Sequence, residues 1–150
     1  MNVCGPEGLA LTGRSLHPGQ AQGTVLVLDE PLSFWGGVNH TGTIVDAHHP
    51  QCGAALAGRV LAMPSGRGSS SSTAVLAELI RAGTAPAGIL LAECDAILVI
   101  GALVAAEMYD VSMPVVQMHA EDLGRLRSGA HASVLARTAP LDAIVKLENR

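Results

Sequence analysis

A glycine- and serine-rich segment is the part of this chain whose residue types and spacing could do chemistry. Residues 64–73 read Pro-Ser-Gly-Arg-Gly-Ser-Ser-Ser-Ser-Thr and lie between an apolar run, residues 60–63, and a helical pattern, residues 74–82. A loop that leads from a strand into a helix directs backbone N–H groups and hydroxyls toward the space above the helix N-terminus. This segment, named the serine loop here, is therefore a candidate anion-binding site.

Two nucleotide-binding patterns fit the serine loop poorly. A Walker loop needs Lys directly after its last glycine, and here Ser69 follows Gly68. A dinucleotide fingerprint could use Gly66 and Gly68, with Glu93 as the ribose-binding acid, but Ser71 replaces its third glycine. A flexible Gly/Ser connector is a further alternative. Because two apolar elements flank the loop directly, a connector would have nothing separate to connect.

The cysteines predict neither a disulfide framework nor a zinc site. Cys4, Cys52 and Cys94 are an odd number at wide spacing, without a Cys-x-x-Cys pair. Cys94 follows a predicted strand, and we expect it to be a small buried residue rather than a nucleophile.

Histidines gather in the middle of the chain, where a metal site has to be considered. His40, His48, His49 and Cys52 fall within thirteen residues. Pro50 prevents a regular helix that would bring His48 and Cys52 to one face. A polar surface or interface loop is therefore favoured over a metal site, and we expect this chain to bind no metal.

The apolar pattern predicts an α/β chain. Apolar runs indicate strands over residues 8–15, 23–28, 60–63, 88–92, 114–118, 132–137 and 143–147. Helices are expected over residues 74–82 and from Asp95 to about Met108. This alternation implies crossover connections and a mixed, partly parallel sheet with flanking helices.

Caps and loops complete the prediction. Ser71 or Ser72 can cap the first helix, and Gly83 can end it. Residues 32–38 carry two of the three aromatic side chains beside a glycine pair. Such a cluster either anchors a loop to the core or forms a binding surface. The long irregular segment 39–53 is consistent with a functional loop.

Composition limits the function classes. The 150 residues fit one domain, residues 1–150, with 49% hydrophobic and only 15% charged residues. A surface so poor in charge suggests that another chain covers part of it. A net charge of −4, scattered cations and 2% aromatic residues argue against nucleic-acid binding. Because no targeting segment or apolar stretch long enough to span a bilayer is present, we expect a cytoplasmic protein without membrane contact.

Four motifs in one order carry a family resemblance. They are Pro-Leu-Ser-Phe-Trp-Gly-Gly-Val at residues 31–38, His-Pro-Gln-Cys-Gly at 49–53, the serine loop, and Gly-Ala-Leu-Val-Ala-Ala-Glu at 101–107. Together they resemble the small, swivelling subunit of aconitase X enzymes over roughly residues 11–145. The resemblance implies the swivelling β/β/α domain of the aconitase superfamily, with a mixed sheet or barrel-like core and flanking helices.

The resemblance also implies an enzyme of two subunits with different roles. A large catalytic subunit is expected to hold an iron or iron–sulfur centre and most of the pocket for a small hydroxy acid. The small subunit contributes a serine, and the matching position is Ser69, the expected catalytic base. Further loop residues are expected to bind the substrate: Ser65, Gly66, Arg67, Gly68, Ser70 and Ser71.

Serine is a weak base, so the anionic form of the Ser69 hydroxyl must be stabilised by other groups. Family reactions remove the proton alpha to a carboxylate while a beta hydroxyl leaves. A helix N-terminus contributes about 0.3–1 kcal/mol toward the anionic form. Further activation must come from the partner, so we expect activity only when both chains are present. Arg67 could bind the substrate carboxylate with its planar fork, or it could be a loop residue tied to a nearby carboxylate.

Two family reactions compete, and a non-catalytic role remains a third hypothesis. Classical aconitases have Gly-Ser-Ser-Arg where Gly-Ser-Ser-Ser stands at residues 68–71, which favours a smaller, less charged acid than a tricarboxylate. The residues of these motifs resemble those of enzymes that dehydrate cis-3-hydroxy-L-proline to 1-pyrroline-2-carboxylate. They are less similar to those of enzymes that dehydrate mevalonate 5-phosphate. A structural or regulatory swivel module without chemistry would show no dependence on Ser69.

Overall fold

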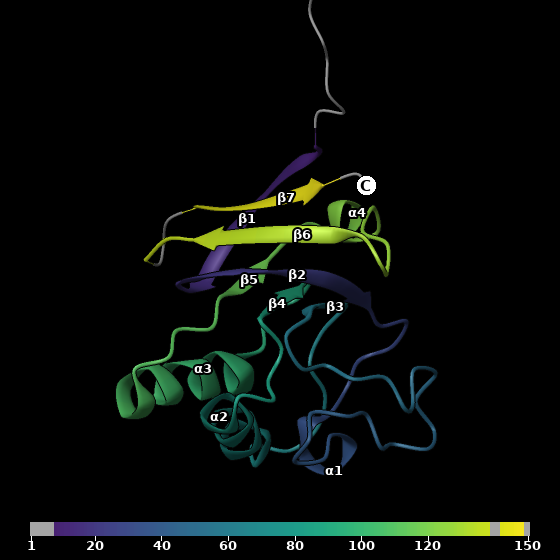
Figure 1. Cartoon of the computed structure of the whole chain (residues 1–150), viewed down its shortest axis with the longest axis vertical. Coiled ribbons are helices and arrows are strands. Elements are labelled where there is room, and N and C mark those ends of the chain that lie inside the picture. The colour runs from purple at the N-terminus through teal and green to yellow at the C-terminus, as the bar shows by residue number, and fades with distance from the viewer. Residues whose placement is uncertain (1–7, 139–141, 149–150) are drawn as a thin grey trace, which may run out of the picture.

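Strands and helices alternate along the chain in the computed structural model, which describes residues 8–138 and 142–148 (Figure 1). Strands in these residues are β1 (Ala10–His17), β2 (Gly19–Val27), β3 (Val60–Met63), β4 (Gly88–Leu91), β5 (Val115–Gln117), β6 (His131–Ala136) and β7 (Asp142–Glu148). Helices are α1 (Phe34–Gly37), α2 (Ser72–Ala82), α3 (Ala96–Tyr109) and α4 (Ala120–Leu123). The strands and the two long helices are therefore those that the apolar pattern predicts.

The strands of the described residues join into a closed ring in the order β1-β5-β4-β3-β2-β6-β7. Within it, β2, β3, β4 and β5 run parallel to one another, because α2 and α3 form the crossovers from β3 to β4 and from β4 to β5. The pairs that involve β1, β6 and β7 are antiparallel, and β7 closes the ring on β1. The predicted mixed sheet with flanking helices is confirmed.

Burial explains why the two kinds of strand have different sequences. Every residue of β3 (Val-Leu-Ala-Met) and β4 (Gly-Ile-Leu-Leu) is buried, since one face lies inside the ring and the other lies under helices. By contrast, β7 alternates buried and more exposed residues, with Ala143, Val145 and Leu147 facing inward. Strands covered on both faces need continuous apolar runs, and strands covered on one face need alternation.

The two long helices begin and end at predicted residues. Gly83 takes the left-handed conformation (φ 77°), and its N–H bonds back to the carbonyls of Leu79 and Ile80. The Asp95 carboxylate accepts hydrogen bonds from the N–H groups of Ile97 and Leu98 at the start of α3. None of the helices in the described residues has the length and apolar character needed to cross a membrane.

Candidate active site

The serine loop leaves the carboxyl end of β3 and leads into α2. At its start, the Pro64 carbonyl accepts hydrogen bonds from the N–H groups of Ala92 and Glu93, at 3.1 and 3.0 Å. The loop therefore begins beside the end of β4. In α/β folds, both open sheets and closed barrels usually bind ligands at the carboxyl ends of their parallel strands, and the serine loop lies at this end of β3.

Gly66 lies between two segments that are distant in sequence. On one side, it forms a parallel bridge with Leu32, in the loop that follows β2. On the other side, a Cβ atom at this position would collide with the Asp95 carboxylate at the start of α3. The absence of a side chain is thus what allows the serine loop to pass between residues 32–35 and residues 95–98.

Gly68 fixes the backbone immediately before Ser69. It has φ 96°, which side chains rarely adopt, and an added Cβ would lie 2.5 Å from the Ser33 hydroxyl oxygen. Gly68 therefore lets the chain turn toward α2 while Ser33 packs against it. The position of Ser69 depends on this turn.

Ser71 occupies the N-cap position of α2, as the sequence predicts, and Ser69 lies two residues before it. The Ser69 Oγ accepts a hydrogen bond of 3.1 Å from the Ser71 N–H, and the Ser69 carbonyl accepts one of 3.0 Å from the Ser72 N–H. Ser71, expected to be a cap, makes no side-chain capping bond. Ser72, the other expected cap, is buried, and its hydroxyl accepts the Trp35 N–H at 3.0 Å. Ser71 therefore holds the N-cap position without a capping side chain, and contact with Trp35 engages the Ser72 hydroxyl.

This geometry favours negative charge on the Ser69 oxygen. The N–H donor from Ser71 and the N-terminus of α2 both stabilise an anionic hydroxyl. Within the described residues, the Ser69 hydroxyl has no acceptor for its own proton and no hydrogen bond to a His, Asp or Glu side chain. A group outside these residues must therefore take that proton if Ser69 is to act as a base.

The other expected substrate-binding residues lie along the same loop. Arg67, Ser70 and Ser71 are exposed, and Ser65 and Gly66 are half-buried. Arg67 makes no ion pair with any residue in the two described ranges, so the structure does not tie it to a neighbouring carboxylate. Its guanidinium is available to a ligand.

His49 has a structural role in the part of the chain considered for metal binding. The buried ring accepts the Gln51 N–H at Nδ1, 3.0 Å, and its Nε2–H donates to the Glu30 carbonyl, 3.1 Å. The Gln51 amide also donates to the Asp29 carboxylate at 2.8 Å. Because both ring nitrogens are occupied, His49 attaches segment 39–53 to the end of β2 and offers no free nitrogen to a metal.

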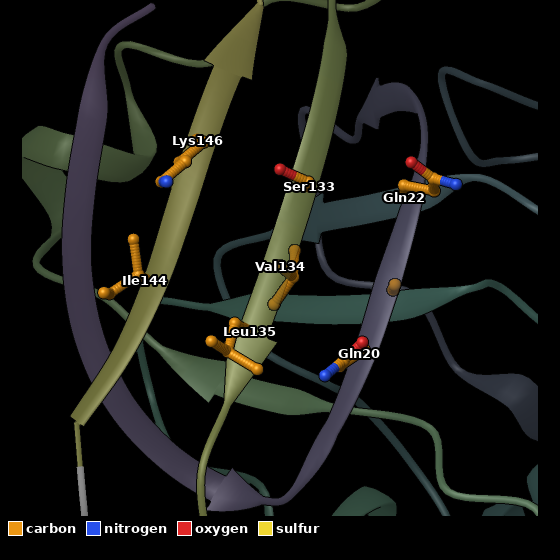
Figure 2. A pocket seen from close by; sticks show the side chains of 8 residues that line it. Gln20, Gln22, Ser133, Val134, Leu135, Ile144 and Lys146 are labelled. Atoms are coloured by element: carbon orange, nitrogen blue, oxygen red, sulfur yellow. The ribbon is translucent and has the colours of Figure 1, made fainter.

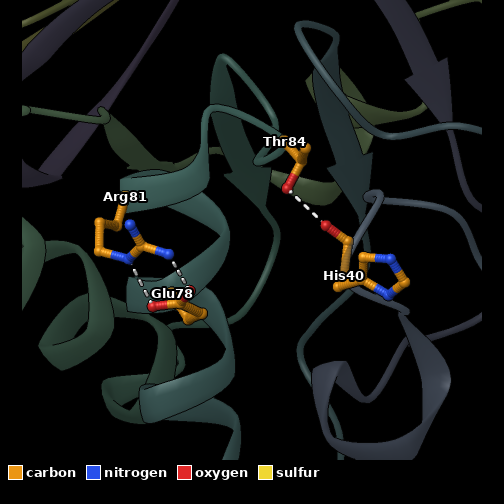
Figure 3. A network of polar contacts seen from close by, with 4 residues as sticks. All are labelled: His40, Glu78, Arg81 and Thr84. Carbon is orange, nitrogen blue, oxygen red and sulfur yellow. Dashed lines mark hydrogen bonds and ion pairs between the residues drawn. The ribbon is translucent and has the colours of Figure 1, made fainter.

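The remaining candidates for metal binding lie apart. His40, His48 and Cys52 are exposed, and the His40 carbonyl accepts the Thr84 hydroxyl at 3.0 Å (Figure 3). Over residues 8–138 and 142–148, no three His, Cys, Asp or Glu side chains gather in a group that could hold a metal ion. The residues described here therefore do not fit an iron centre.

Cys94 is exposed, contrary to the expectation of a buried residue. The buried strand β4 ends at Leu91, and Cys94 lies in the turn that leads to α3. Cys4 falls outside the described residues.

The aromatic cluster at residues 32–38 divides between the two roles left open by the sequence. Phe34 is fully buried and anchors the loop, whereas 59% of Trp35 is exposed. The contact between Trp35 and Ser72 is a feature that sequence reasoning missed. The only sequence feature that could have indicated this contact is the Phe-Trp-Gly-Gly motif, and the motif alone does not show that the turn lies against the serine loop.

A separate hollow lies on the outer face of β2, β6 and β7 (Figure 2). Its lining residues include Gln20, Gln22, Ser133, Leu135 and Lys146, and none comes from the serine loop. Lys146 is the one charged residue of the lining, so the hollow does not bring a base and an anion-binding group together.

Comparisons by sequence lead to one family. The sequence model of the aconitase X swivel domain family matches residues 10–142. The chain is 50% identical over 103 residues to a cis-3-hydroxy-L-proline dehydratase of Pseudomonas aeruginosa, which covers 68% of this chain and 18% of that protein. It is 36% identical over 129 residues to the phosphomevalonate dehydratase small subunit of Thermococcus onnurineus, which covers 85% of this chain and 93% of that subunit. The chain spans about a fifth of the length of the hydroxyproline dehydratases that it matches.

Comparison of structures agrees. The crystal structure of Thermococcus kodakaraensis aconitase X in its holo form matches with a TM-score of 0.81 and 31% sequence identity, over 95% of this chain and 100% of that chain. A fold shared at this level, together with a sequence match over residues 10–142, shows the family. The chain belongs to the aconitase X swivel domain family.

Proposed function

We propose that this chain is the small subunit of an aconitase X dehydratase that removes water from cis-3-hydroxy-L-proline, with Ser69 as the catalytic base. The observation that carries the proposal is the position of the Ser69 hydroxyl just before α2. Its oxygen accepts the Ser71 N–H, and its proton is donated to no group among the described residues. The relatives named phosphomevalonate dehydratase small subunit support the two-chain form, since this chain covers 93% of one of them.

The serine loop provides one wall of a site, and the partner must provide the others. In the proposed reaction, the Ser69 oxygen takes the proton from the carbon next to the substrate carboxylate. The electron pair left behind forms a carbon–carbon double bond as hydroxide leaves the neighbouring carbon. The resulting enamine rearranges to 1-pyrroline-2-carboxylate. Arg67 and the hydroxyls of Ser70 and Ser71 would hold the carboxylate.

Activation of Ser69 is assigned to the large subunit. The helix end and one N–H donor supply only about 1 kcal/mol toward the anionic hydroxyl. We therefore place the iron or iron–sulfur centre, and the group that accepts the Ser69 proton, in the large subunit. The described residues of this chain offer no group of metal ligands of their own.

The charge of the serine loop favours hydroxyproline over mevalonate 5-phosphate as the substrate. Arg67 is the one Lys or Arg among residues 64–73. A phosphate group is usually bound by several cations or N–H donors, whereas a single carboxylate is satisfied by one guanidinium fork. Relatives carry both names, so the sequence match supports the family reaction more strongly than the substrate.

The test is to produce the chain together with its large subunit and to measure dehydration of both substrates. We expect turnover of cis-3-hydroxy-L-proline that requires both chains. Ser69→Ala should lower kcat at least ~100-fold, as loss of a general base does. Ser133→Ala on β6, away from the serine loop, is the matched control and should leave kcat unchanged.

Each other outcome assigns a different function. Turnover of mevalonate 5-phosphate alone would replace the substrate and keep the mechanism. Unchanged kcat in Ser69→Ala would make the chain a structural or regulatory module. Failure of the two chains to associate would contradict the proposed two-chain enzyme.

A further inference from the structure

The outer face of α3 is apolar although no part of the described chain covers it. Leu98, Ala102 and Ala105 form the buried side of the helix. On the opposite side, Ile100 and Leu103 are each 48% exposed. A helix that is apolar on all sides is normally covered on all sides, so α3 has a surface that this chain alone leaves open to solvent.

The neighbouring helix shows that this is not a general property of the helix layer. The corresponding outer positions of α2 carry Ala74, Glu78 and Arg81. Glu78 and Arg81 form an ion pair that faces solvent (Figure 3). Two adjacent helices of one layer therefore differ on their outer sides, and only α3 has the composition of a contact surface.

The N-terminal half of the α3 outer face is the half nearest the serine loop, and Met108, near the other end of α3, is also exposed, to 66%. The outer face is formed by residues spaced three or four positions apart, which a helix brings to one side. They are Ala96, Ile100, Leu103 and Glu107. The first three are apolar, and Glu107 is charged. At the N-terminal end of α3, the Thr73 hydroxyl donates to the Ile97 carbonyl at 2.8 Å, which joins the first turns of α2 and α3.

Trp35 presents a second exposed apolar side chain on the other flank of the loop. Its φ/ψ of −73°, 113° and those of Gly36, 77°, −13°, are the values of a type II turn. The Trp35 N–H donates to the Ser72 hydroxyl, and the Ser33 hydroxyl donates to the Trp35 carbonyl, both at 3.0 Å. The backbone is thus held in place while 59% of the side chain is exposed. A rigidly held, exposed Trp is a common anchor of protein interfaces.

We propose that the large subunit docks on this chain through the outer face of α3, Ala96, Ile100 and Leu103, and through Trp35; this docking face rests on the proposed function. Residues 32–35 and 95–98 lie on the two sides of Gly66. A surface that contacts both flanks also covers the serine loop, excludes water from it and brings the missing walls of the site to Ser69.

A large partner fits this position better than a second copy does. The hydroxyproline dehydratases that match this chain carry the same segment as about a fifth of a longer protein. In such a protein the segment belongs to a much larger body. A second copy would instead place two serine loops together, and the described residues of this chain hold no metal-binding group to complete the site.

The test measures the Kd for the purified large subunit. We expect Ile100→Glu and Trp35→Ala each to raise the Kd at least ~30-fold, because each removes a central contact. Leu135→Glu is the matched control, since Leu135 is also an exposed apolar residue, 38% exposed on β6. Its Kd should change less than ~2-fold, as at sites outside interfaces. Ile100→Ser serves if the Glu variant does not fold by circular dichroism.

The outcomes separate this proposal from the proposed function. Unchanged affinity in Ile100→Glu and Trp35→Ala would overturn the docking face, while the Ser69→Ala experiment would still report on the function. Absence of binding by the wild-type chain would contradict both. A concentration-dependent dimer of the isolated chain that is lost in Ile100→Glu would assign the face to a second copy and overturn the proposal.

Discussion

The parallel and antiparallel parts of the ring differ in what covers their outer faces. Helices cover β3 and β4, so all residues of these strands are buried. In the described part of the chain, no helix covers the outer face of β6 and β7, where Leu135 and Lys146 are exposed (Figures 1 and 2). Each covering helix must start from a loop at the carboxyl end of a parallel strand. The parallel part therefore gains a helix N-terminus and a loop in which hydroxyls and N–H groups can be placed, and the antiparallel part gains neither.

The antiparallel part contributes a closed core instead. Its inward side chains, such as Val134 and Val145, meet Val60 and Leu90 of the parallel part inside the ring. This closure holds β3 and β4 in place at the positions from which the serine loop and α3 begin. We infer that the antiparallel part acts as a scaffold and that the parallel part carries the site.

The largest expected effect comes from truncating an outward leucine in each region. Leu61 of β3 is fully buried under the helices, whereas Leu135 of β6 is exposed. Leu61→Ala should lower the free energy of unfolding by about 2–5 kcal/mol. Leu135→Ala should change it by less than about 0.5 kcal/mol. Urea denaturation measures both, and equal losses would show that the outer faces do not differ as described.

A smaller effect is expected from two glycines at the ends of the segment that carries the site. Gly68 and Gly83 both have positive φ, but only at Gly68 would a Cβ meet another atom, the Ser33 hydroxyl oxygen. Gly83→Ala should lower stability by about 1 kcal/mol, and Gly68→Ala by about 2 kcal/mol.

Activity should separate these two variants further. In the two-chain enzyme, Gly68→Ala should lower kcat at least ~10-fold because it displaces Ser69, as small misplacements of catalytic groups do. Gly83→Ala should leave kcat unchanged, because Gly83 lies at the far end of α2. A normal kcat in Gly68→Ala would show that the serine loop tolerates displacement.

The smallest effect is expected on the solvent side of the helix layer. The hydrogen bond from Arg81 holds the pKa of the Glu78 carboxyl below its ordinary value. A lowered pKa in the folded state stabilises the protein above the unfolded value, near 4.5, and this contribution is lost as the pH falls through the folded value. Both side chains are exposed, so solvent screens the pair.

Thermal melts of Glu78→Gln therefore provide a control for the buried substitutions. The Tm should fall only slightly at pH 7, and the difference from the wild type should disappear in acid. A large loss at pH 7 would mean that the outer side of α2 is more important for stability than its exposure indicates.

Much of the parallel part could be predicted from the sequence because its signals are local. The apolar runs of β3 and β4, the Asp95 cap and the Gly83 end all follow from neighbouring residues. Strand pairing was not local in the same way, since β1 and β2 follow one another in the chain but each pairs with other strands. The short helices α1 and α4 were not predicted, since four residues carry too little periodicity.

Predictions failed where a distant segment decides the outcome. Ser72 was one of two expected caps for α2, but its hydroxyl accepts the Trp35 N–H, 37 positions away, and Ser71 holds the N-cap position without a side-chain capping bond. His49 fell in a group of possible metal ligands, yet contact with Glu30 makes it a structural residue. Cys94 was expected inside the protein but lies beyond the end of β4.

By itself, the sequence determined the alternation of strands and helices and the position of the serine loop between β3 and α2, because hydrophobic period and helix caps depend on residues close in the chain. Tertiary structure alone decided that residues 32–35 and 95–98 flank Gly66, and that the Ser72 hydroxyl accepts the Trp35 N–H instead of capping α2. It also decided that α3 keeps an apolar outer face. These features depend on which distant backbone groups reach the same hydroxyls and surfaces, and only the folded chain brings those groups together.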